Sequence, residues 1–162
     1  MKRKSMEEAE CPVARALDLI GDWWTLLIVR DAFDGMRRFS DFQSSLGISR
    51  GILSARLKGL VDCGILEMVP PEDGGAHHDY LLTAKGAALF PILVGLRQWG
   101  ETHCFEPGEP HSILVERTTG RRIGPLKLED ASGQPLEAAM TEVRKVAAAP
   151  VRTGRKRAAQ NA

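Results

Sequence analysis

The sequence lacks the long apolar runs that mark a membrane protein. None of its apolar segments approaches the roughly 18 residues that a membrane-spanning helix requires. The first residues, MKRKSMEEAE, are charged and contain no apolar stretch of the kind found in signal peptides. We therefore expect a chain without membrane association that stays in the cytoplasm.

Cysteine is scarce, and the usual signatures of catalysis are missing. Cys11, Cys63 and Cys104 are widely spaced and form no CxxC pair, so neither a disulfide framework nor a zinc site is predicted. His103, Cys104 and His111 follow no established ligand spacing, so no metal is expected. The chain also lacks a phosphate-binding glycine loop and a nucleophile elbow. These absences argue against an enzyme, and we predict no catalytic residue and no cofactor.

Charge is balanced overall, at a formal net charge of +1, but it is unevenly distributed. Residues 144–162 hold six basic residues and no acidic one, among small and polar residues. This composition favours a disordered basic tail, which would strengthen binding to any nucleic acid through counterion release. With 162 residues and 43% hydrophobic content, the chain has room for one cored domain and an appendage.

Two helices are predicted near the N-terminus. Pro12 suits a first helical position, and apolar residues recur at helical spacing from Val13 until Gly21. The segment DWWTLLIVRDAFDG follows, with Asp22 as its N-cap and Gly35 as its stop. The nearly continuous hydrophobicity of this second segment predicts a helix that is buried on most sides.

The stretch RFSDFQSSLGISRGILSARLKGLVDCGIL contains two short helical patterns around a glycine turn. Ser40 and Gln43 match a capping box for the first helix, which Gly47 ends. Ser49 caps the second helix. When its residues are placed 100° apart, the apolar sector contains Leu53, Leu57, Leu60 and Val61. The opposite sector presents short polar and basic positions, namely Arg50, Gly51, Ser54, Ala55 and Lys58, with Arg56 on the flank.

Two helices joined by such a turn are typical of a helix-turn-helix, whose second helix enters the major groove of DNA. The alternative is an ordinary helical hairpin with a solvated face. The following residues favour the first interpretation, because ILEMVP and YLLT are strand-like runs that flank the turn-rich segment PEDGGAHHD. The expected fold class is therefore α+β, a mainly helical winged helix-turn-helix domain with a two-stranded wing.

The C-terminal half is predicted to hold a long helix and a small β-rich appendage. Thr83 caps the helix, and Pro91 is expected to kink it. Its apolar stripe would be buried against the domain or against a second copy. Beyond it, ILVERTTGRRIGPLKLED suggests two strands around a glycine turn. The predicted division is a domain at 11–104, a β-appendage at 105–137, and a weak helix with the disordered basic tail at 138–162.

Several motifs between residues 11 and 101 occur together: the opening CPV, a Gly-x-x-Trp, the lead-in RRFSDF, the segment LxxRLxxLVxxGIL, and the closing LTxKG…PxLxxLxxWG. In these motifs the sequence resembles the HxlR-type bacterial transcriptional regulators, which are MarR-like. The resemblance implies a homodimer that binds double-stranded operator DNA with dyad symmetry and regulates transcription at the nucleoid. It further implies a dimer seam from the first and the long helix, including Val13, Leu17, Leu93, Leu96 and Trp99.

Within this interpretation, Arg50 is the first candidate to read a base edge, because arginine makes bidentate contacts with guanine. Ser54 and Lys58 share its exposed sector. Arg56 on the flank, and Arg37 and Arg38 ahead of the third helix, are better placed for phosphates or for ion pairs within the fold. For each arginine the alternative is a solvated surface charge.

Helix N-termini and the wing complete the predicted DNA-binding set. Ser40 and Ser49 place helix N-termini near the duplex, where backbone N–H groups can bind phosphate. His77 and His78 occupy the wing, where many members of the family carry arginine. Acidic residues lie close by, at Glu72, Asp73 and Asp79, so contact between the wing and the minor groove stays open.

Some members of the family respond to oxidants through a cysteine at the position of Cys11. A helix N-terminus favours a thiolate there, whereas nearby glutamates oppose it. Cys11 is thus a redox-sensing candidate, with an unreactive capping thiol as the alternative. Trp23, Trp24 and Trp99 fit a core better than a pocket for a small-molecule effector. A protein-interaction module and a non-specific nucleoid-type DNA binder are the competing functions.

Overall fold

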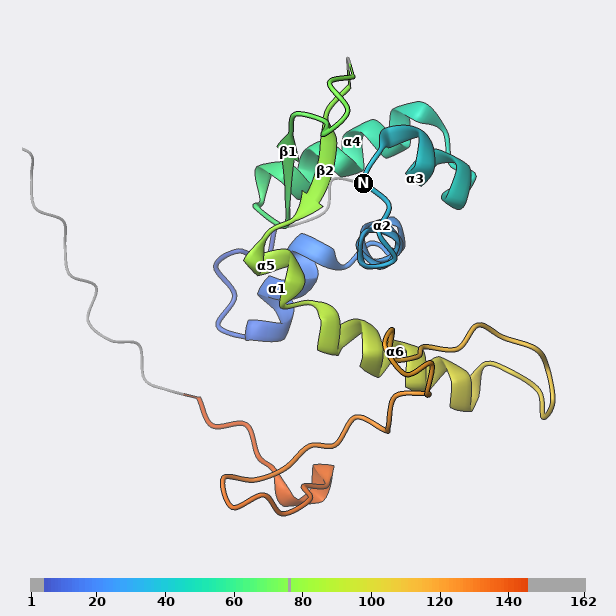
Figure 1. Cartoon of the computed structure of the whole chain (residues 1–162). Helices are drawn as coiled ribbons and strands as arrows, with labels where there is room; N and C mark the ends of the chain where they lie inside the picture. Colours follow the sequence, from blue (N-terminus) through green and yellow to red (C-terminus); the bar gives the residue numbers. More distant parts are fainter. Residues whose placement is uncertain (1–4, 76, 146–162) are drawn as a thin grey trace, which may run out of the picture. The chain divides into compact units, whose positions relative to one another are not determined.

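The computed structural model describes residues 5–75 and 77–145 of the chain (Figure 1). The chain divides into two compact units, of which the first ends at Leu126 and the second begins at Lys127. The elements follow in the order α1 Pro12–Ile20, α2 Trp23–Phe33, α3 Phe39–Leu46, α4 Arg50–Asp62, β1 Leu66–Val69, β2 Asp79–Leu82, α5 Ala84–Ala87, α6 Phe90–His103 and the 3-10 turn η1 Ala138–Met140. Within the described residues, every helix is too short or too polar to cross a membrane.

The first two helices form as the sequence predicts. Pro12 lies in the first turn of α1, where its missing N–H costs no helical hydrogen bond. Asp22 caps α2, because its carboxylate accepts hydrogen bonds from the Thr25 N–H at 3.2 Å and the Thr25 hydroxyl at 2.5 Å. α2 contacts α1, α3, α4, α6 and β2, which explains why its apolar residues are nearly continuous. In Figure 1 it lies between the α3–α4 pair and α6.

The helix-turn-helix is α3, the turn at Gly47 and α4. Gly47 adopts a φ of 63°, a left-handed conformation that glycine reaches without strain. Ser49 caps α4 through a hydrogen bond from the Ile52 N–H, so this part of the prediction is confirmed. The capping box at Ser40 is wrong. α3 begins earlier, with Arg38 at the N-cap, and the Ser40 hydroxyl donates instead to the neighbouring Asp41 carboxylate at 3.3 Å.

The core of the first unit joins these helices to the start of the sheet. Phe42 of α3 is fully buried, and the predicted apolar sector of α4 is confirmed at three positions: Leu53, Leu57 and Leu60 are at most 2% exposed, whereas Val61 is half-buried. Ile28 and Val29 of α2 pack into the same cluster, together with Ile65 and Leu66. One side of α4 is therefore fixed, and the other side faces outward.

The wing is an antiparallel pair. Leu66 of β1 pairs with Leu82 of β2, and Val69 pairs with Asp79 at the other end. The connecting loop contains the Pro- and Gly-rich turn that the sequence indicates. A helix-turn-helix followed by this hairpin confirms the predicted winged-helix fold.

The predicted long helix is two helices. α5 ends at Ala87 and α6 begins at Phe90, so the expected single kinked helix is wrong. Pro91 lies in the first turn of α6, where its missing N–H is tolerated, and it therefore starts a helix rather than bending one.

The segment after α6 packs onto that helix, so the first unit extends well beyond residue 104. The Arg97 guanidinium donates to the Ser112 carbonyl at 2.9 Å. Gln98 donates to the Gly124 carbonyl at 2.9 Å and accepts from the Leu126 N–H at 2.7 Å. Instead of the two expected strands, this segment forms a single antiparallel bridge between residues 115 and 122, and α6 side chains bond the backbone on either side of it.

The second unit also departs from the expectation of regular structure. An isolated bridge joins Glu129 to Pro135 around a turn held by the Asp130 carboxylate. Where a weak helix was predicted, the chain makes the short turn η1. The basic tail falls mostly on residues 146–162, outside the described residues.

Candidate nucleic-acid interface

The outward side of α4 carries the polar sector that the sequence indicates. Its members are all exposed, namely Arg50, Gly51, Ser54, Ala55 and Lys58. Because the opposite side is fixed in the core, this surface has a defined orientation. A helix presented in this way can enter a major groove with its N-terminal residues toward the base edges.

The Arg50 side chain is exposed, but a contact with α3 restrains it. Its guanidinium carbon lies 5.6 Å from the centre of the Phe39 ring of α3, a cation–π contact that holds the side chain across the helix-turn-helix. Ser49, directly before it, caps the helix. The Arg50 side chain is thus held against Phe39 beside the N-terminus of α4.

Two other basic side chains of α4 make ion pairs within the fold. The Arg56 guanidinium lies 3.2 Å from the Asp22 carboxylate, which also caps α2. Of the two roles predicted for Arg56, this geometry favours the internal ion pair. Lys58 pairs with Asp62 at 2.5 Å on the surface, and both side chains are largely exposed. An exposed pair of this kind is weak, so Lys58 stays available to a phosphate.

Arg37 and Arg38, just before α3, contact the wing. The Arg37 guanidinium lies 3.3 Å from the Glu72 carboxylate, and the Arg37 carbonyl accepts a hydrogen bond from the Tyr80 N–H at 2.8 Å. Arg38 forms an ion pair with Asp73. The hydrogen bond from Arg38 holds the pKa of the Asp73 carboxyl below its usual range, and the same pair raises the pKa of Arg38.

The remaining predicted contacts lie on the same part of the first unit. His77 and His78 are exposed in the wing loop, and Ser40 is exposed in the first turn of α3. Sequence reasoning noted the acidic residues of the wing but missed their pairing with Arg37 and Arg38. The complementary doublets are visible in the sequence, but they lie 35 residues apart, and only the fold brings them together.

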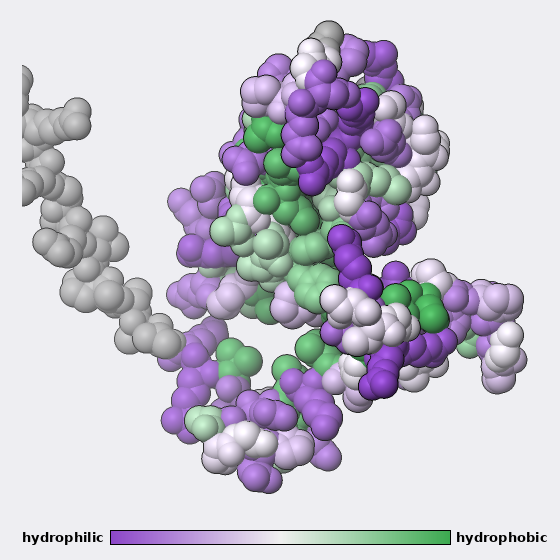
Figure 2. Space-filling model, viewed as in Figure 1, coloured by the Kyte–Doolittle hydropathy of each residue, from purple (hydrophilic) through white to green (hydrophobic). Residues whose placement is uncertain are grey.

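Apolar side chains lie exposed on α1 and α6. On α1, Val13 is 65% exposed, and Leu17 is also exposed. On α6, Leu96 is 50% and Trp99 is 61% exposed, whereas Leu93 is half-buried. Figure 2 shows that hydrophilic residues predominate at the tip of the wing and that hydrophobic ones gather below it, in the middle of the first unit. Exposed apolar patches of this kind mark interaction surfaces.

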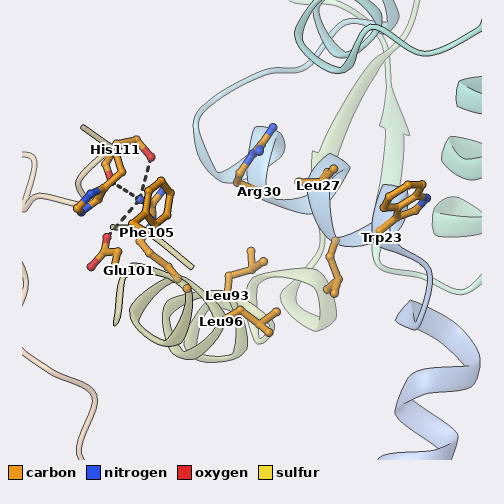
Figure 3. Close-up of a pocket in the computed structure, with 12 residues that line it drawn as sticks. Trp23, Leu27, Arg30, Leu93, Leu96, Glu101, Phe105 and His111 are labelled. Carbon is orange, nitrogen blue, oxygen red and sulfur yellow. Dashed lines mark hydrogen bonds and ion pairs between the residues drawn. The ribbon is translucent and has the colours of Figure 1, made fainter. Parts of the chain in front are cut away.

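An open pocket of about 510 Å³ lies between α2 and α6, and residues of the segment after α6 line one end of it. Trp23 stands at one end and Phe105, Glu101 and His111 gather at the other (Figure 3). Pockets of this size and apolar character suit small molecules. Trp23 is 73% exposed, so the assignment of Trp23 and Trp99 to the core is wrong, whereas Trp24 is half-buried and packs against it.

The three cysteines are free thiols in different surroundings. Cys11 is exposed at the N-cap of α1, where its side chain makes no capping hydrogen bond among the described residues. Cys104 is also exposed, and Cys63 is half-buried, with its thiol 3.5 Å from the Leu60 carbonyl. Cys11 is thus an accessible thiol at the start of α1.

Comparison with known proteins decides the family. The sequence pattern described as HxlR-like helix-turn-helix matches residues 19–107, more than half of the chain. The chain belongs to this family. It is a transcriptional regulator with a helix-turn-helix DNA-binding domain. The HTH-type transcriptional regulator Rv3095 of Mycobacterium tuberculosis H37Rv is 40% identical over 126 residues, which cover 78% of this chain and 80% of the relative.

Solved structures of other regulators share the fold of this HxlR-like chain. The crystal structure of the transcription factor PA1607 is 51% identical, covers 88% of this chain and 100% of its own, and aligns with a TM-score of 0.84. The redox regulator HypR in its oxidized form is 31% identical and covers 57% of this chain and 97% of its own, with a TM-score of 0.53. PA1607 therefore extends the likeness well beyond the helix-turn-helix.

Proposed function

We propose that this HxlR-like protein acts as a homodimer at the nucleoid, in the cytoplasm, and binds an operator with dyad symmetry. The observation that carries the proposal is the fixed orientation of α4, with Arg50 held over Phe39 at the edge of an exposed polar face. Arg50 reads a base edge in the major groove, and Ser54 lies on the same face.

Phosphate contacts come from the surroundings of this face. The N-terminus of α4 at Ser49 offers backbone N–H groups, and Lys58 offers an exposed ammonium group. Arg37, Arg38 and the first turn of α3 at Ser40 flank the same groove, and the wing brings His77 and His78. Arg56 acts indirectly in this arrangement, because its ion pair with Asp22 ties α4 to the start of α2.

Apolar residues of α1 and α6, all exposed except the half-buried Leu93, form the dimer seam. Its members are Val13, Leu17, Leu93, Leu96 and Trp99. In a two-fold dimer the same patch covers itself, and the two α4 helices then reach half-sites about 34 Å apart. The pocket between α2 and α6 borders this seam through Leu93 and Leu96, so a small-molecule effector bound there would be linked to dimerisation.

An Arg50→Ala variant tests the mode of recognition. From genomic fragments at about 0.15 M salt, where non-specific binding is weakened, the wild type is expected to select a short dyad motif. Loss of a bidentate arginine contact costs about 1–3 kcal/mol, so the variant should lose roughly 5- to 150-fold in affinity for that motif. Lys58→Ala is the matched control, since it should weaken binding to all sequences alike and keep the motif.

Featureless enrichment by both the wild type and Arg50→Ala would count against the proposal. It would favour the non-specific nucleoid-type binder. A wild type that binds no duplex at all would favour the protein-interaction module.

Cys11 is the proposed redox sensor of this regulator. The support is its exposure at the start of a seam helix and the likeness to HypR, which is named a redox regulator. We expect mild oxidation to lower the operator affinity of the wild type and to leave that of Cys11→Ser unchanged, as measured by fluorescence anisotropy. Cys104→Ser is the control, because it removes another exposed thiol and should respond like the wild type. An equal loss of affinity in Cys11→Ser would exclude Cys11 as the sensor.

A further inference from the structure

The acidic turn of the wing and the arginine doublet before α3 are joined by ion pairs. Glu72 pairs with Arg37, and Asp73 pairs with Arg38. The Asp73 carboxylate also accepts a hydrogen bond from the Gly75 N–H at 3.1 Å, which shapes the turn that carries it. These contacts connect the wing to the helix-turn-helix at a place where a winged helix meets DNA.

β2 holds the backbone of the arginine doublet, whereas the guanidinium groups pair with the exposed turn. The Tyr80 N–H donates to the Arg37 carbonyl, which fixes the backbone of the doublet to β2. Asp79 of β2 is 6% exposed, and the Arg38 guanidinium lies 3.9 Å from its carboxylate. By contrast, the side chain of Glu72 is 88% exposed and that of Asp73 is 55% exposed. The backbone contact with β2 therefore does not depend on the two ion pairs with the turn.

We propose that the acidic turn of the wing, Glu72 and Asp73, is a built-in competitor for DNA phosphate, which occupies the guanidinium groups of Arg37 and Arg38 in the free protein. The inference rests on the proposed function, because it presumes a duplex along α3 and α4. Phosphate and carboxylate both bind guanidinium through charge-assisted, bidentate hydrogen bonds, so the two compete for the same donors. Exposed ion pairs are weak, and a phosphate backbone can displace them.

This competition affects both the affinity for DNA and the change of that affinity with salt concentration. When an arginine that was free in solution binds phosphate, condensed counterions leave the DNA and the salt slope grows. When the arginine must first break its ion pair with a carboxylate, that carboxylate takes up cations from solution. This uptake offsets part of the counterion release from the DNA. The wing turn thus lowers both the affinity for DNA and the steepness of its salt dependence.

A double-mutant cycle separates this competition from simple repulsion between acidic residues and DNA. The variants are Asp73→Asn, Arg38→Gln and the two combined, measured by anisotropy on the selected operator duplex across a salt series. Asp73→Asn is expected to raise the affinity roughly two- to fivefold, the range of an exposed ion pair, and to steepen the salt slope. In the Arg38→Gln background the same change should have no effect. Asp62→Asn is the matched control, because it frees Lys58 and should not be coupled to Arg38.

A gain from Asp73→Asn of equal size in both backgrounds would overturn the inference, since it would show repulsion without competition. A second measurement needs no DNA. Side-chain carboxyl NMR should show Asp73 titrating at a lower pH in the wild type than in Arg38→Gln; an identical titration would also overturn the inference. A wild type that binds no duplex would instead remove the proposed function, and the inference with it.

Discussion

A Leu96→Asp variant is expected to be monomeric and to lose operator binding at concentrations where the wild type is saturated. Leu96 lies on the exposed side of α6 between Leu93 and Trp99, at helical spacing. In the proposed seam, a carboxylate at this position would be buried without a partner, a cost of several kcal/mol. Because Leu96 is half exposed in a single copy, the same change leaves the folded chain intact. Light scattering and anisotropy on the operator duplex measure the two effects.

Ile113→Asp is the matched control for this experiment. Ile113 is 47% exposed, close to the exposure of Leu96, but it lies in the segment after α6 and outside the proposed seam. It should remain dimeric and bind the operator normally. A dimeric Leu96→Asp variant would place the seam elsewhere, and the exposed residues of α1 would be the next to test.

The elements that were predicted correctly are those fixed by local chemistry. Asp22 and Ser49 cap their helices in the structure because a cap depends on residues two or three positions away. Gly47 ends α3 for the same local reason. The apolar sector of α4 is confirmed because one period of 3.6 residues decides which side is buried. From these residues the helix-turn-helix and its outward face follow without tertiary information.

The errors arise where distant residues compete with a local pattern. Ser40 has the spacing of a capping box, but α3 starts earlier, and Phe39 packs against the core while its ring lies under Arg50. The strand-like residues after α6 pair with each other only around one bridge, and the backbone on either side of it bonds to Arg97 and Gln98 of α6. The pairs between the wing and the arginine doublet are non-local in the same sense. The sequence alone indicated the candidate DNA-binding residues, but it did not show which of them form ion pairs within the fold.

Gly86 carries the largest expected effect on stability. It is buried in α5, and an ideal Cβ built there would lie 2.2 Å from the Ile65 carbonyl oxygen and 2.9 Å from a methyl carbon of Leu82. The same carbonyl accepts a hydrogen bond from the Thr83 N–H at 3.1 Å, and the Thr83 hydroxyl caps α5 at the Gly86 N–H. A methyl group at Gly86 therefore forces α5 away from the start of β1 and strains that cap.

Overpacking costs about 1–3 kcal/mol, the weakened cap up to about 1 kcal/mol, and the alanine regains about 1 kcal/mol of helix propensity. We therefore expect Gly86→Ala to lower the free energy of unfolding by about 1–3 kcal/mol relative to the wild type. Urea denaturation measures this change in the free energy of unfolding.

Gly100→Ala is the control, because its Cβ would meet nothing within 4 Å among the described residues. Both changes replace glycine by alanine within a helix and gain the same intrinsic propensity, about 1 kcal/mol. Gly100→Ala should thus be neutral or slightly stabilising, and the difference between the two variants measures the cost of the close contacts at Gly86 together with the weakened cap. Equal stability of the two variants would show that α5 can move off β1 at little cost, and the close packing of α5 against the wing would then not be needed to hold the domain together.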